Sequence, residues 1–354
     1  MATATEPLLA VRDLAVTFAT RHGPVHAVDS LSFEVRRGRT LGIVGESGSG
    51  KSVTSMAVLG LHTGAEVSGS IALEGRELVG LPERELSRLR GRRMAMVFQD
   101  PLSSLHPYYT VGEQLAEHHR VHFGSRRAAA RRRAVEMLAE VGIPEPERRA
   151  GEYPHQFSGG MRQRVMIAMA LVCEPDLLIA DEPTTALDVT VQAQILELLA
   201  RLQEERSLAV VLITHDLGVV ARVAHEVLVM YGGRAAEQAP VEALFAAPAH
   251  PYTRGLLDSL PRLDDADDAP LRAIPGSPPS LLTPTPGCAF APRCPRAAAA
   301  DWADRERCTR HRPRLVAAGG HAVACHLPLG PAPAPGAPGH PRSEGPDQIR
   351  KVTP

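Results

Sequence analysis

The segment GESGSGKS, residues 45–52, constrains the fold of this chain more than any other stretch. It follows an apolar run, Thr40–Val44, that is typical of a buried strand, and a helix-like pattern comes directly after it. This is the G-x-x-x-x-G-K-S pattern in a strand–loop–helix context. Gly45, Gly48 and Gly50 allow the backbone to fold closely around phosphates, because the amides of such a loop point at negative charge. The pattern predicts a phosphate-binding loop in an α/β sheet.

The lysine of this loop is conspicuous, because the chain contains only two lysines, Lys51 and Lys351, and uses arginine at every other strongly basic position. A compact ammonium on a flexible stem suits a phosphate loop better than a planar guanidinium does. Ser52 offers a hydroxyl to Mg²⁺. The alternative, a glycine-rich surface turn, explains neither the preceding strand nor the lysine. The other loop residues expected to contact the nucleotide are Glu46, Ser47, Ser49 and Val53.

Three further apolar runs each lead into polar residues suited to phosphoryl transfer. These residues are Gln99 after 94–98, Asp181 and Glu182 after 177–180, and His215 after 210–214. Each is weak evidence alone, since a histidine or glutamine after a strand is usually structural. Because the carboxyl ends of parallel strands share the edge where α/β sheets bind ligands, we expect them to meet there. One carboxylate can hold Mg²⁺ together with Ser52, and the next can orient or deprotonate water, so we predict that Asp181 binds the metal and that Glu182 acts on water.

A second anion-binding segment lies further along the chain. Ser158, Gly159 and Gly160 precede a helical apolar pattern, and serine and glycines at a helix start form an anion-binding end. One nucleotide does not need two such ends from one chain, whereas a dimer in which this end caps the partner's nucleotide would use both. The nucleotide itself is expected to be ATP, because a chain without asparagine cannot carry the Asn-Lys-x-Asp guanine reader of GTPases.

Taken in order, these motifs resemble the nucleotide-binding subunit of ABC transporters over residues 6–245. The corresponding family motifs are Walker A at 45–52, the Q-loop at Gln99, the signature at Ser158–Gln163, Walker B at Leu177–Glu182, the D-loop at Ala186–Asp188 and the switch histidine at His215. The resemblance implies that His215 and Gln99 are catalytic partners of Glu182 and that Gln99 also holds Mg²⁺. It further implies that Gln163 and Asp188 contact nucleotide and that Phe18 stacks on adenine. Phe157 and Met161 at the ends of the signature are similar to the dipeptide, oligopeptide and nickel importer branch. So are HPYTRGLLDSLPR at 250–262 and IPGSPPSLL at 274–282.

The implied architecture is an α/β P-loop core of the ABC type with a β-rich start. We expect an ATPase domain at 1–245 with an inserted helical subdomain at about 100–175, then an extension at 246–327. The tail at 328–354 is too rich in proline and glycine to pack, so it is predicted to be disordered. The basic run at 126–133 favours a solvated helix face over a nucleic-acid site.

The resemblance implies that the chain binds and hydrolyses ATP for a prokaryotic peptide importer. Its expected partners are a second ATPase subunit, identical or different, two membrane permeases and, indirectly, an extracytoplasmic binding protein. We see no signal peptide and no run of about 18 apolar residues, so a peripheral position on the cytoplasmic face of the inner membrane is expected. The alternatives are a soluble ABC ATPase of translation or DNA repair, an importer of nickel or another small solute, and a metal-sensing regulator.

Four cysteines near the end of the chain form the pattern C-x₅-C-x₁₃-C-x₁₆-C. They are Cys288, Cys294, Cys308 and Cys325, while Cys173 stands in an apolar run and is expected in the core. A reducing compartment disfavours disulfides, and a metal centre can fold a region poor in apolar residues. Spacing alone leaves zinc and a [4Fe–4S] cluster open. Resemblance to the C-terminal region of cluster-bearing peptide-importer ATPases favours [4Fe–4S]. Zinc is the alternative, with His311, His321 or His326 as substitute ligands.

Overall fold

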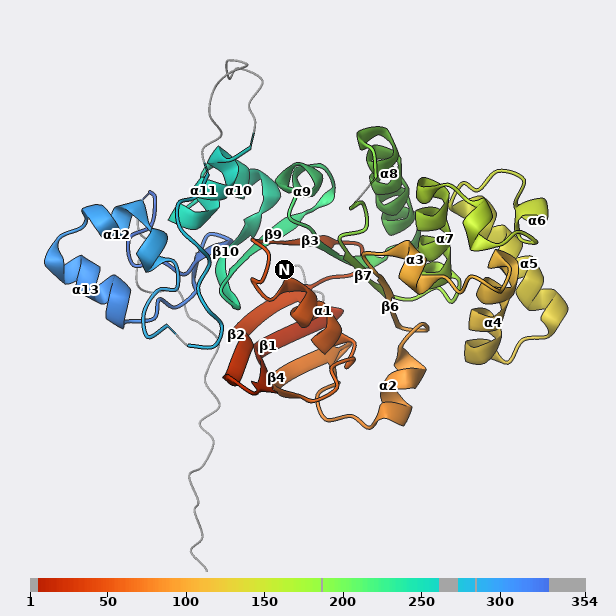
Figure 1. The fold of residues 1–354 in the computed structure, drawn as a ribbon, viewed down its shortest axis with the longest axis horizontal. Helices are drawn as coiled ribbons and strands as arrows, with labels where there is room; N and C mark the ends of the chain where they lie inside the picture. The colour runs from red at the N-terminus through yellow and green to blue at the C-terminus, as the bar shows by residue number, and fades with distance from the viewer. Residues whose placement is uncertain (1–5, 186, 261–272, 284, 331–354) are drawn as a thin grey trace, which may run out of the picture.

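The computed structural model describes residues 6–185, 187–260, 273–283 and 285–330. Most of the tail that the sequence predicts to be disordered lies outside the described residues, and so does Ala186 of the D-loop. One continuous sheet runs from the region of the predicted phosphate loop into the extension that carries the four cysteines (Figure 1).

In the described part of the chain the main sheet has eight strands, and five consecutive ones, ending at the edge strand β6, pair in parallel. In order across the sheet they are β9 (Glu226–Tyr231), β3 (Thr40–Val44), β8 (Ala209–Ile213), β7 (Leu177–Asp181) and β6 (Met94–Val97). β3, β7 and β8 are buried along their whole length, as expected of parallel strands covered on both faces. The predicted strands therefore lie side by side, and their carboxyl ends reach one edge.

A second, antiparallel sheet forms the β-rich start that the sequence predicts. Its order is β2 (Gly23–Val35), β1 (Leu9–Thr20), β4 (Ala65–Leu73) and β5 (Arg76–Glu77). Helix α1 (Lys51–Val58) contacts strands of both sheets, and a shared core that includes Leu14, Phe33 and Ile43 joins them. Helix α2 (Glu83–Leu89) connects this region to β6. The mixed α/β class is confirmed.

The insertion between β6 and β7 is helical throughout its described part, as predicted. It contains α3 (Pro101–Ser104), α4 (Val111–Phe123), α5 (Arg127–Glu140), α6 (Pro146–Arg149), the 3₁₀ turn η1 (Pro154–Gln156) and α7 (Gly159–Leu171). A reciprocal capping box between Thr110 and Glu113 starts α4. Buried side chains such as Leu115 and Met137 join this subdomain to α8 (Val189–Arg206), and α9 (Leu217–Val223) follows β8.

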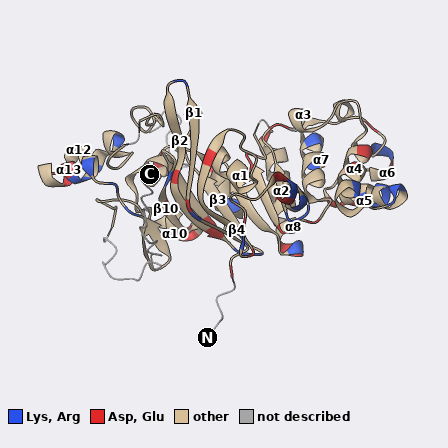
Figure 2. Ribbon diagram, turned by 90° about the horizontal axis from the view of Figure 1, so that it is seen from below, with Lys and Arg blue, Asp and Glu red and all other residues tan. Residues whose placement is uncertain are grey.

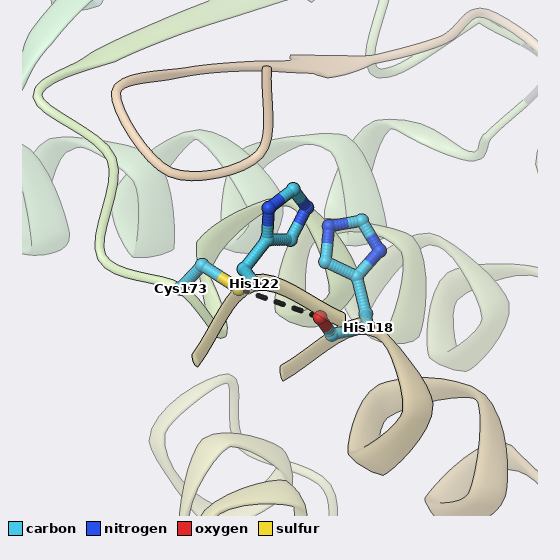
Figure 3. A group of neighbouring side chains, drawn as sticks. All are labelled: His118, His122 and Cys173. Atoms are coloured by element: carbon cyan, nitrogen blue, oxygen red, sulfur yellow. Dashed lines mark hydrogen bonds between the residues drawn. The ribbon is translucent and has the colours of Figure 1, made fainter. Parts of the chain in front are cut away.

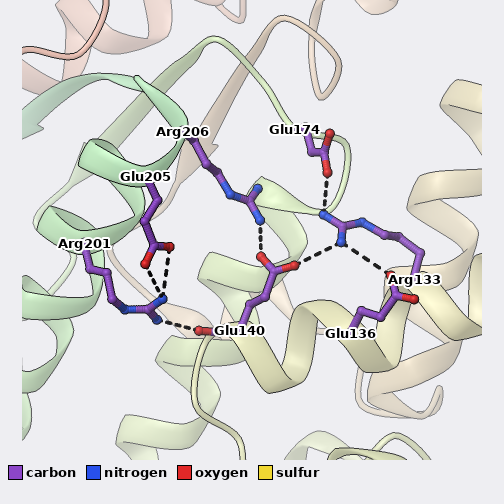
Figure 4. Close-up of polar contacts among 7 residues, drawn as sticks. All are labelled: Arg133, Glu136, Glu140, Glu174, Arg201, Glu205 and Arg206. Atoms are coloured by element: carbon purple, nitrogen blue, oxygen red, sulfur yellow. Dashed lines mark hydrogen bonds and ion pairs between the residues drawn. The ribbon is translucent and has the colours of Figure 1, made fainter.

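Arg133, the last residue of the basic run in α5, is ion-paired within the chain. Arg133 contacts Glu136, Glu140 and Glu174, and Arg206 at the end of α8 pairs with Glu140 (Figure 4). Figure 2 places the basic segments of α5 and α6 at the outer end of the helical subdomain. Part of the run therefore fastens the subdomain to α8, and the rest is a solvated face, as the sequence predicts.

The extension packs on the other end of the main sheet (Figure 1). After β10 (Arg234–Pro240) come α10 (Val241–Ala246), α11 (Pro251–Asp258), η2 (Ala291–Arg293), α12 (Pro295–Ala299), α13 (Trp302–Arg310), β11 (Val316–Ala318) and β12 (His321–Val323). Strand β12 pairs with β10, so the sheet continues into the extension. Tyr252 and Phe290 are buried in a small core here, which the low apolar content of the sequence did not predict.

Candidate nucleotide site

The loop between β3 and α1 adopts a conformation that two of its glycines make accessible. Gly45 has φ 155° and Gly50 has φ 98°. A Cβ on Gly45 would lie 2.3 Å from the Met230 carbonyl oxygen, and one on Gly50 would lie 2.4 Å from the Ala27 carbonyl oxygen. The loop is therefore seated against strands on both sides, and α1 begins at its end with its first amides free of any side-chain cap.

Lys51 lies folded onto its own loop. Its Nζ donates to the carbonyl oxygens of Gly45 at 2.7 Å and Glu46 at 2.9 Å, and it lies 3.4 Å from Oγ of Ser49. Burial lowers the pKa of the ammonium, while the carboxylates of Glu182, Asp181 and Glu46 act in the opposite direction. The one lysine of the core therefore lies at the centre of an acidic cluster, available to phosphate oxygens.

Glu182 is the residue on which the other predicted catalytic side chains converge. Nε2 of Gln99 donates to Oε2 of Glu182 at 3.0 Å, Oγ1 of Thr185 donates to the same oxygen at 3.0 Å, and Nδ1 of His215 lies 3.0 Å from Oε1. Burial raises the pKa of Glu182, but the contacts with His215 and Thr185 outweigh it, so the pKa lies below its usual value. The carboxylate is ionised at neutral pH and can accept a proton.

Asp181 ends β7 as a buried carboxylate. Burial raises its pKa, and a hydrogen bond from the Ser52 side chain acts against that rise. Its Oδ1 has no hydrogen-bond partner among the described residues. An orphaned carboxylate oxygen beside a serine hydroxyl fits a hard divalent cation, so Ser52 and Asp181 suit Mg²⁺. Gln99, the third expected Mg²⁺ ligand, lines the cavity together with Ser52 and is hydrogen-bonded to Glu182.

One open cavity of about 580 Å³ collects most of the predicted residues. Its lining comprises Ser47, Gly48, Ser49, Gly50, Lys51, Ser52, Val53, Gln99, Glu182 and His215. This size is within the range of small-molecule and cofactor sites. The phosphate loop therefore faces the carboxylate that can activate water, across a space that can take a triphosphate.

The signature residues lie outside this cavity. Ser158 caps α7, and its Oγ accepts from the Met161 amide at 3.4 Å. Gly159 is exposed, and Gly160 packs on Val191 of α8, where a Cβ would meet a methyl carbon at 2.6 Å. Asp188 caps α8 beside it by accepting from the Val191 amide. The N-termini of α7 and α8 thus present an exposed surface away from the chain's own phosphate loop.

Comparisons with known proteins identify the family. A family model described as "ABC transporter" matches residues 28–185, and one described as "Oligopeptide/dipeptide transporter, C-terminal region" matches residues 236–300. The oligopeptide transport ATP-binding protein OppD of Salmonella typhimurium is 53% identical over 323 residues, 91% of this chain and 94% of that protein. The chain belongs to the oligopeptide and dipeptide ABC transporter ATP-binding family. It is an ABC-type ATPase subunit.

Other relatives agree with this assignment. The dipeptide transport ATP-binding protein DppD of Bacillus subtilis is 52% identical over 293 residues, 82% of this chain and 87% of that protein. Among solved structures, the dimeric bacterial ABC transporter cassette MJ0796 matches with a TM-score of 0.60 and 28% identity, over 66% of this chain and 98% of its own. A similar match is to the same cassette in a dimeric, post-hydrolysis state bound to ADP and phosphate.

Two residues that the ABC resemblance assigns to nucleotide contact, Gln163 and Phe18, lie outside the cavity lining. Gln163 is 2% exposed inside α7, and its Nε2 has no hydrogen-bond partner within the described chain. Phe18 on β1 packs edge-on against the His62 ring, with the centroids 5.3 Å apart, outside the cavity lining. His62 in turn lies 2.7 Å from the Val53 carbonyl oxygen in α1. No sequence motif marked His62, which positions Phe18 beside the nucleotide helix.

The four cysteines of the extension are brought into one neighbourhood. The Cys288 amide donates to the Cys308 carbonyl oxygen at 2.8 Å, and Cys294 and Cys308 are buried. Burial raises the pKa of the Cys325 thiol to about 12, and the nearby Cys288, Cys294 and Cys308 add to this. The histidines considered as substitute ligands have other contacts. His321 Nε2 lies 2.6 Å from a Glu237 carboxylate oxygen, and His326 Nε2 lies 2.7 Å from the His311 carbonyl oxygen.

A different trio also has metal-ligand chemistry. His118, His122 and Cys173 have ligand atoms within 4.8 Å of one another (Figure 3). Burial lowers the pKa of both histidines, and the charge of Arg92 lowers that of His122 further. Burial raises the pKa of the Cys173 thiol to about 11. Burial and the charge of Arg92 thus disfavour the protonated imidazoles, and Cys173 is a core residue as expected.

Proposed function

We propose that this chain binds MgATP and hydrolyses it as the ATPase subunit of a prokaryotic peptide importer. The observation that carries the proposal is the convergence of Gln99, Thr185 and His215 on Glu182, opposite Lys51. The names of the relatives and the match to the oligopeptide/dipeptide C-terminal region support peptides as cargo. That same match counts against a soluble ATPase of translation or DNA repair and against a metal-sensing regulator.

In the proposed reaction, the chain's own groups divide the work. The loop amides and Lys51 bind the phosphates, and Phe18 stacks on the adenine. Glu182 orients the attacking water and takes its proton, since its lowered pKa keeps it ionised. His215 and Gln99 hold that carboxylate in place. When bound by Ser52, Asp181 and Gln99, Mg²⁺ would neutralise charge on the phosphates.

We further propose that two such subunits enclose two nucleotides. Ser158, Gly159, Gly160 and Asp188 lie outside their own chain's cavity, so a partner's nucleotide is the ligand available to them. The dimeric cassettes that resemble this chain support the arrangement. Gln163 would support the α7 terminus from within the helix, because its side chain is buried. The second subunit is either an identical or a related chain.

Work on the cargo requires contact with membrane permeases, because no helix in the described part of the chain is both long and apolar enough to cross a bilayer. We propose that a cytoplasmic permease helix docks in an apolar groove of about 280 Å³ between β6, α3 and α7. Leu61, Phe98, Ser104 and Met169 line it, and the segment 99–109 borders it. The subunit would then lie on the cytoplasmic face of the inner membrane. An extracytoplasmic binding protein would act through the permeases.

We propose that Cys288, Cys294, Cys308 and Cys325 hold a [4Fe–4S] cluster that stabilises the extension. A single tetrahedral zinc with Zn–S bonds of about 2.3 Å brings its sulfurs within about 3.8 Å of one another. Within the described chain, the group whose ligand atoms all lie within 4.8 Å of one another is the histidine–cysteine trio, and the four cysteines do not form such a group. A four-iron cube is larger than one ion and holds its four cysteines further apart. Zinc remains the alternative occupant.

The direct test is reconstitution. The chain, co-expressed with the two permeases of a peptide importer, should copurify with them and show ATPase activity that rises when a peptide-loaded binding protein is added. Glu182→Gln in the same assembly is the matched control, since it should assemble without turning over. Stimulation by nickel and not by peptide would move the assignment to a nickel importer. Failure to copurify with any membrane protein would favour a soluble ABC ATPase.

A further inference from the structure

The cysteine-bearing extension reaches directly into the phosphate loop. Arg293, at the end of η2, donates from Nη1 to Oε2 of Glu46 at 2.7 Å and from Nη2 to Oε1 of Glu46 at 3.1 Å. The two residues are 247 positions apart. The Arg293 side chain is 6% exposed. A buried, two-pronged arginine–carboxylate pair is among the stronger polar contacts in proteins, so it fixes both partners.

The rest of the guanidinium is also held. Nη1 donates to the Tyr231 hydroxyl at 3.1 Å, Nε donates to the Pro275 carbonyl oxygen at 2.8 Å, and Nη2 donates to the Ile274 carbonyl oxygen at 3.2 Å. The Glu46 amide donates to the Tyr252 hydroxyl at 2.9 Å. Both the side chain and the backbone of Glu46 are thus bound by residues from outside the loop.

The position of Glu46 affects the phosphate loop directly, because Glu46 is the second residue of that loop. Its carbonyl oxygen is one of the acceptors of Lys51 Nζ, and its carboxylate acts on the pKa of that ammonium. A free carboxylate at this place would repel a triphosphate and compete with it for Lys51. Paired with Arg293, the carboxylate is neutralised and turned toward the extension.

We propose that Arg293 is a positioning residue for the nucleotide site, through which the docked extension sets the affinity of the phosphate loop for ATP. This inference rests on the proposed nucleotide-binding function. Arg293 acts through Glu46: it removes a competing negative charge from the loop and leaves Lys51 to the phosphates. Phe290, three residues earlier, packs on Tyr231 and Tyr252 at ring-centroid distances of 5.3 Å and 5.4 Å. The segment that carries Arg293 is therefore seated by aromatic packing as well as by charge.

The test is a double-mutant cycle on the purified full-length chain, with the dissociation constant for ATP as the readout. Arg293→Gln removes the charge but keeps hydrogen-bonding capacity, and it should weaken ATP binding about tenfold, which is about 1.4 kcal/mol. In the Glu46→Gln background, the same substitution should cost much less, because no free carboxylate remains to compete. Arg296→Gln, on the exposed side of α12, is the matched control and should bind ATP as the unmodified chain does.

Thermal unfolding of each variant shows whether it is folded. If Arg293→Gln yields too little folded protein, Arg293→Lys can replace it in the same cycle. Lysine keeps the charge but not the two-pronged geometry of the guanidinium, so the loss of ATP affinity should be smaller. An unchanged ATP dissociation constant in Arg293→Gln would overturn the proposal. So would an equal loss in both backgrounds, which would mean that Arg293 only stabilises the extension. Lys51→Ala distinguishes failure of the Arg293 proposal from failure of the proposed nucleotide-binding function. If Lys51→Ala also binds ATP normally, the nucleotide site itself is misassigned.

Discussion

Gln99 and Glu182 lie 83 residues apart in the chain, yet Nε2 of Gln99 donates to Oε2 of Glu182 at 3.0 Å. Gln99 leads from the main sheet into the helical subdomain, whereas Glu182 directly follows β7. A movement of the subdomain would therefore change the surroundings of Glu182, the proposed base. In the proposed arrangement, this hydrogen bond links permease docking in the neighbouring groove to hydrolysis in the cavity.

The first prediction concerns the proposed base. Glu182→Gln should keep ATP binding and lower turnover by about 10²–10⁴, because an amide cannot take a proton from water. Steady-state ATPase rates and ATP affinity, measured on the same preparation, check this. The variant should also accumulate as an ATP-bound dimer in size-exclusion chromatography. Turnover close to that of the unmodified chain would remove Glu182 from the role of base.

The second prediction concerns the exposed end of α7. Ser158→Arg should reduce turnover by roughly a hundredfold or more, since it fills the place of a partner's phosphates, while ATP binding by the single chain stays unchanged. In a mixed dimer with Lys51→Ala chains, one site pairs both lesions and the other is intact, so half of the activity should remain. A Ser158→Arg monomer that no longer binds ATP would show that the signature acts within its own chain.

The third prediction concerns acid. Burial lowers the pKa of His250 to about 4, against 6.5 for an ordinary histidine. Between these values the unfolded chain binds more protons than the folded chain, so stability is lost as pH falls from about 6.5 toward 4. Thermal unfolding across this range should show the loss, and His250→Asn, which keeps a cap for α11, should flatten it. An identical pH slope in the variant would assign the acid sensitivity to other groups.

The fourth prediction concerns the cysteine centre. Protein purified without oxygen should be brown and carry iron and acid-labile sulfide near four per chain, as the cluster formula requires. Cys308→Ser should lose both, whereas Cys173→Ser, in the core of the helical subdomain, should keep them and serves as the control. A colourless protein with one zinc per chain would replace the cluster with a mononuclear site.

The fifth prediction concerns the apolar groove. A photo-crosslinker at Ser104, which lines the groove, should capture a permease in the assembled transporter. The same crosslinker at exposed Arg296, in the extension at the opposite end of the molecule, should not (Figure 1). Capture from Arg296 alone would move the docking surface to the extension.

Local signals predicted the elements of this fold well. The apolar run at 40–44 is β3 with the same bounds, and the helical subdomain expected at about 100–175 contains α3 to α7. The strand-end rule also brought Gln99, Glu182 and His215 together, because it depends only on parallel strands sharing an edge. Such signals are contained within a few residues, so a sequence shows them directly.

The contacts that sequence could not predict depend on where distant segments meet. Nothing near Arg293 marks it as the partner of Glu46, since either charge taken alone fits an exposed loop. Gln163 falls within a recognised motif, yet the rotation of α7 turns its side chain inward. Phe290 and Tyr252 form a core because β12 returns to the main sheet, which local composition does not encode.

The pairing of β12 with β10 has a consequence for the integrity of the whole subunit. Glu237 in β10 is 0% exposed and accepts the amides of Ala249 and His250 at 2.6 Å and 2.9 Å. Without the segments that follow β10, the Glu237 side chain would lie on an uncovered edge strand with unpaired backbone amides. Such an edge can pair with strands of other chains. The extension thus covers this edge of the sheet. It keeps an ATPase subunit that assembles with specific partners from associating non-specifically with other chains.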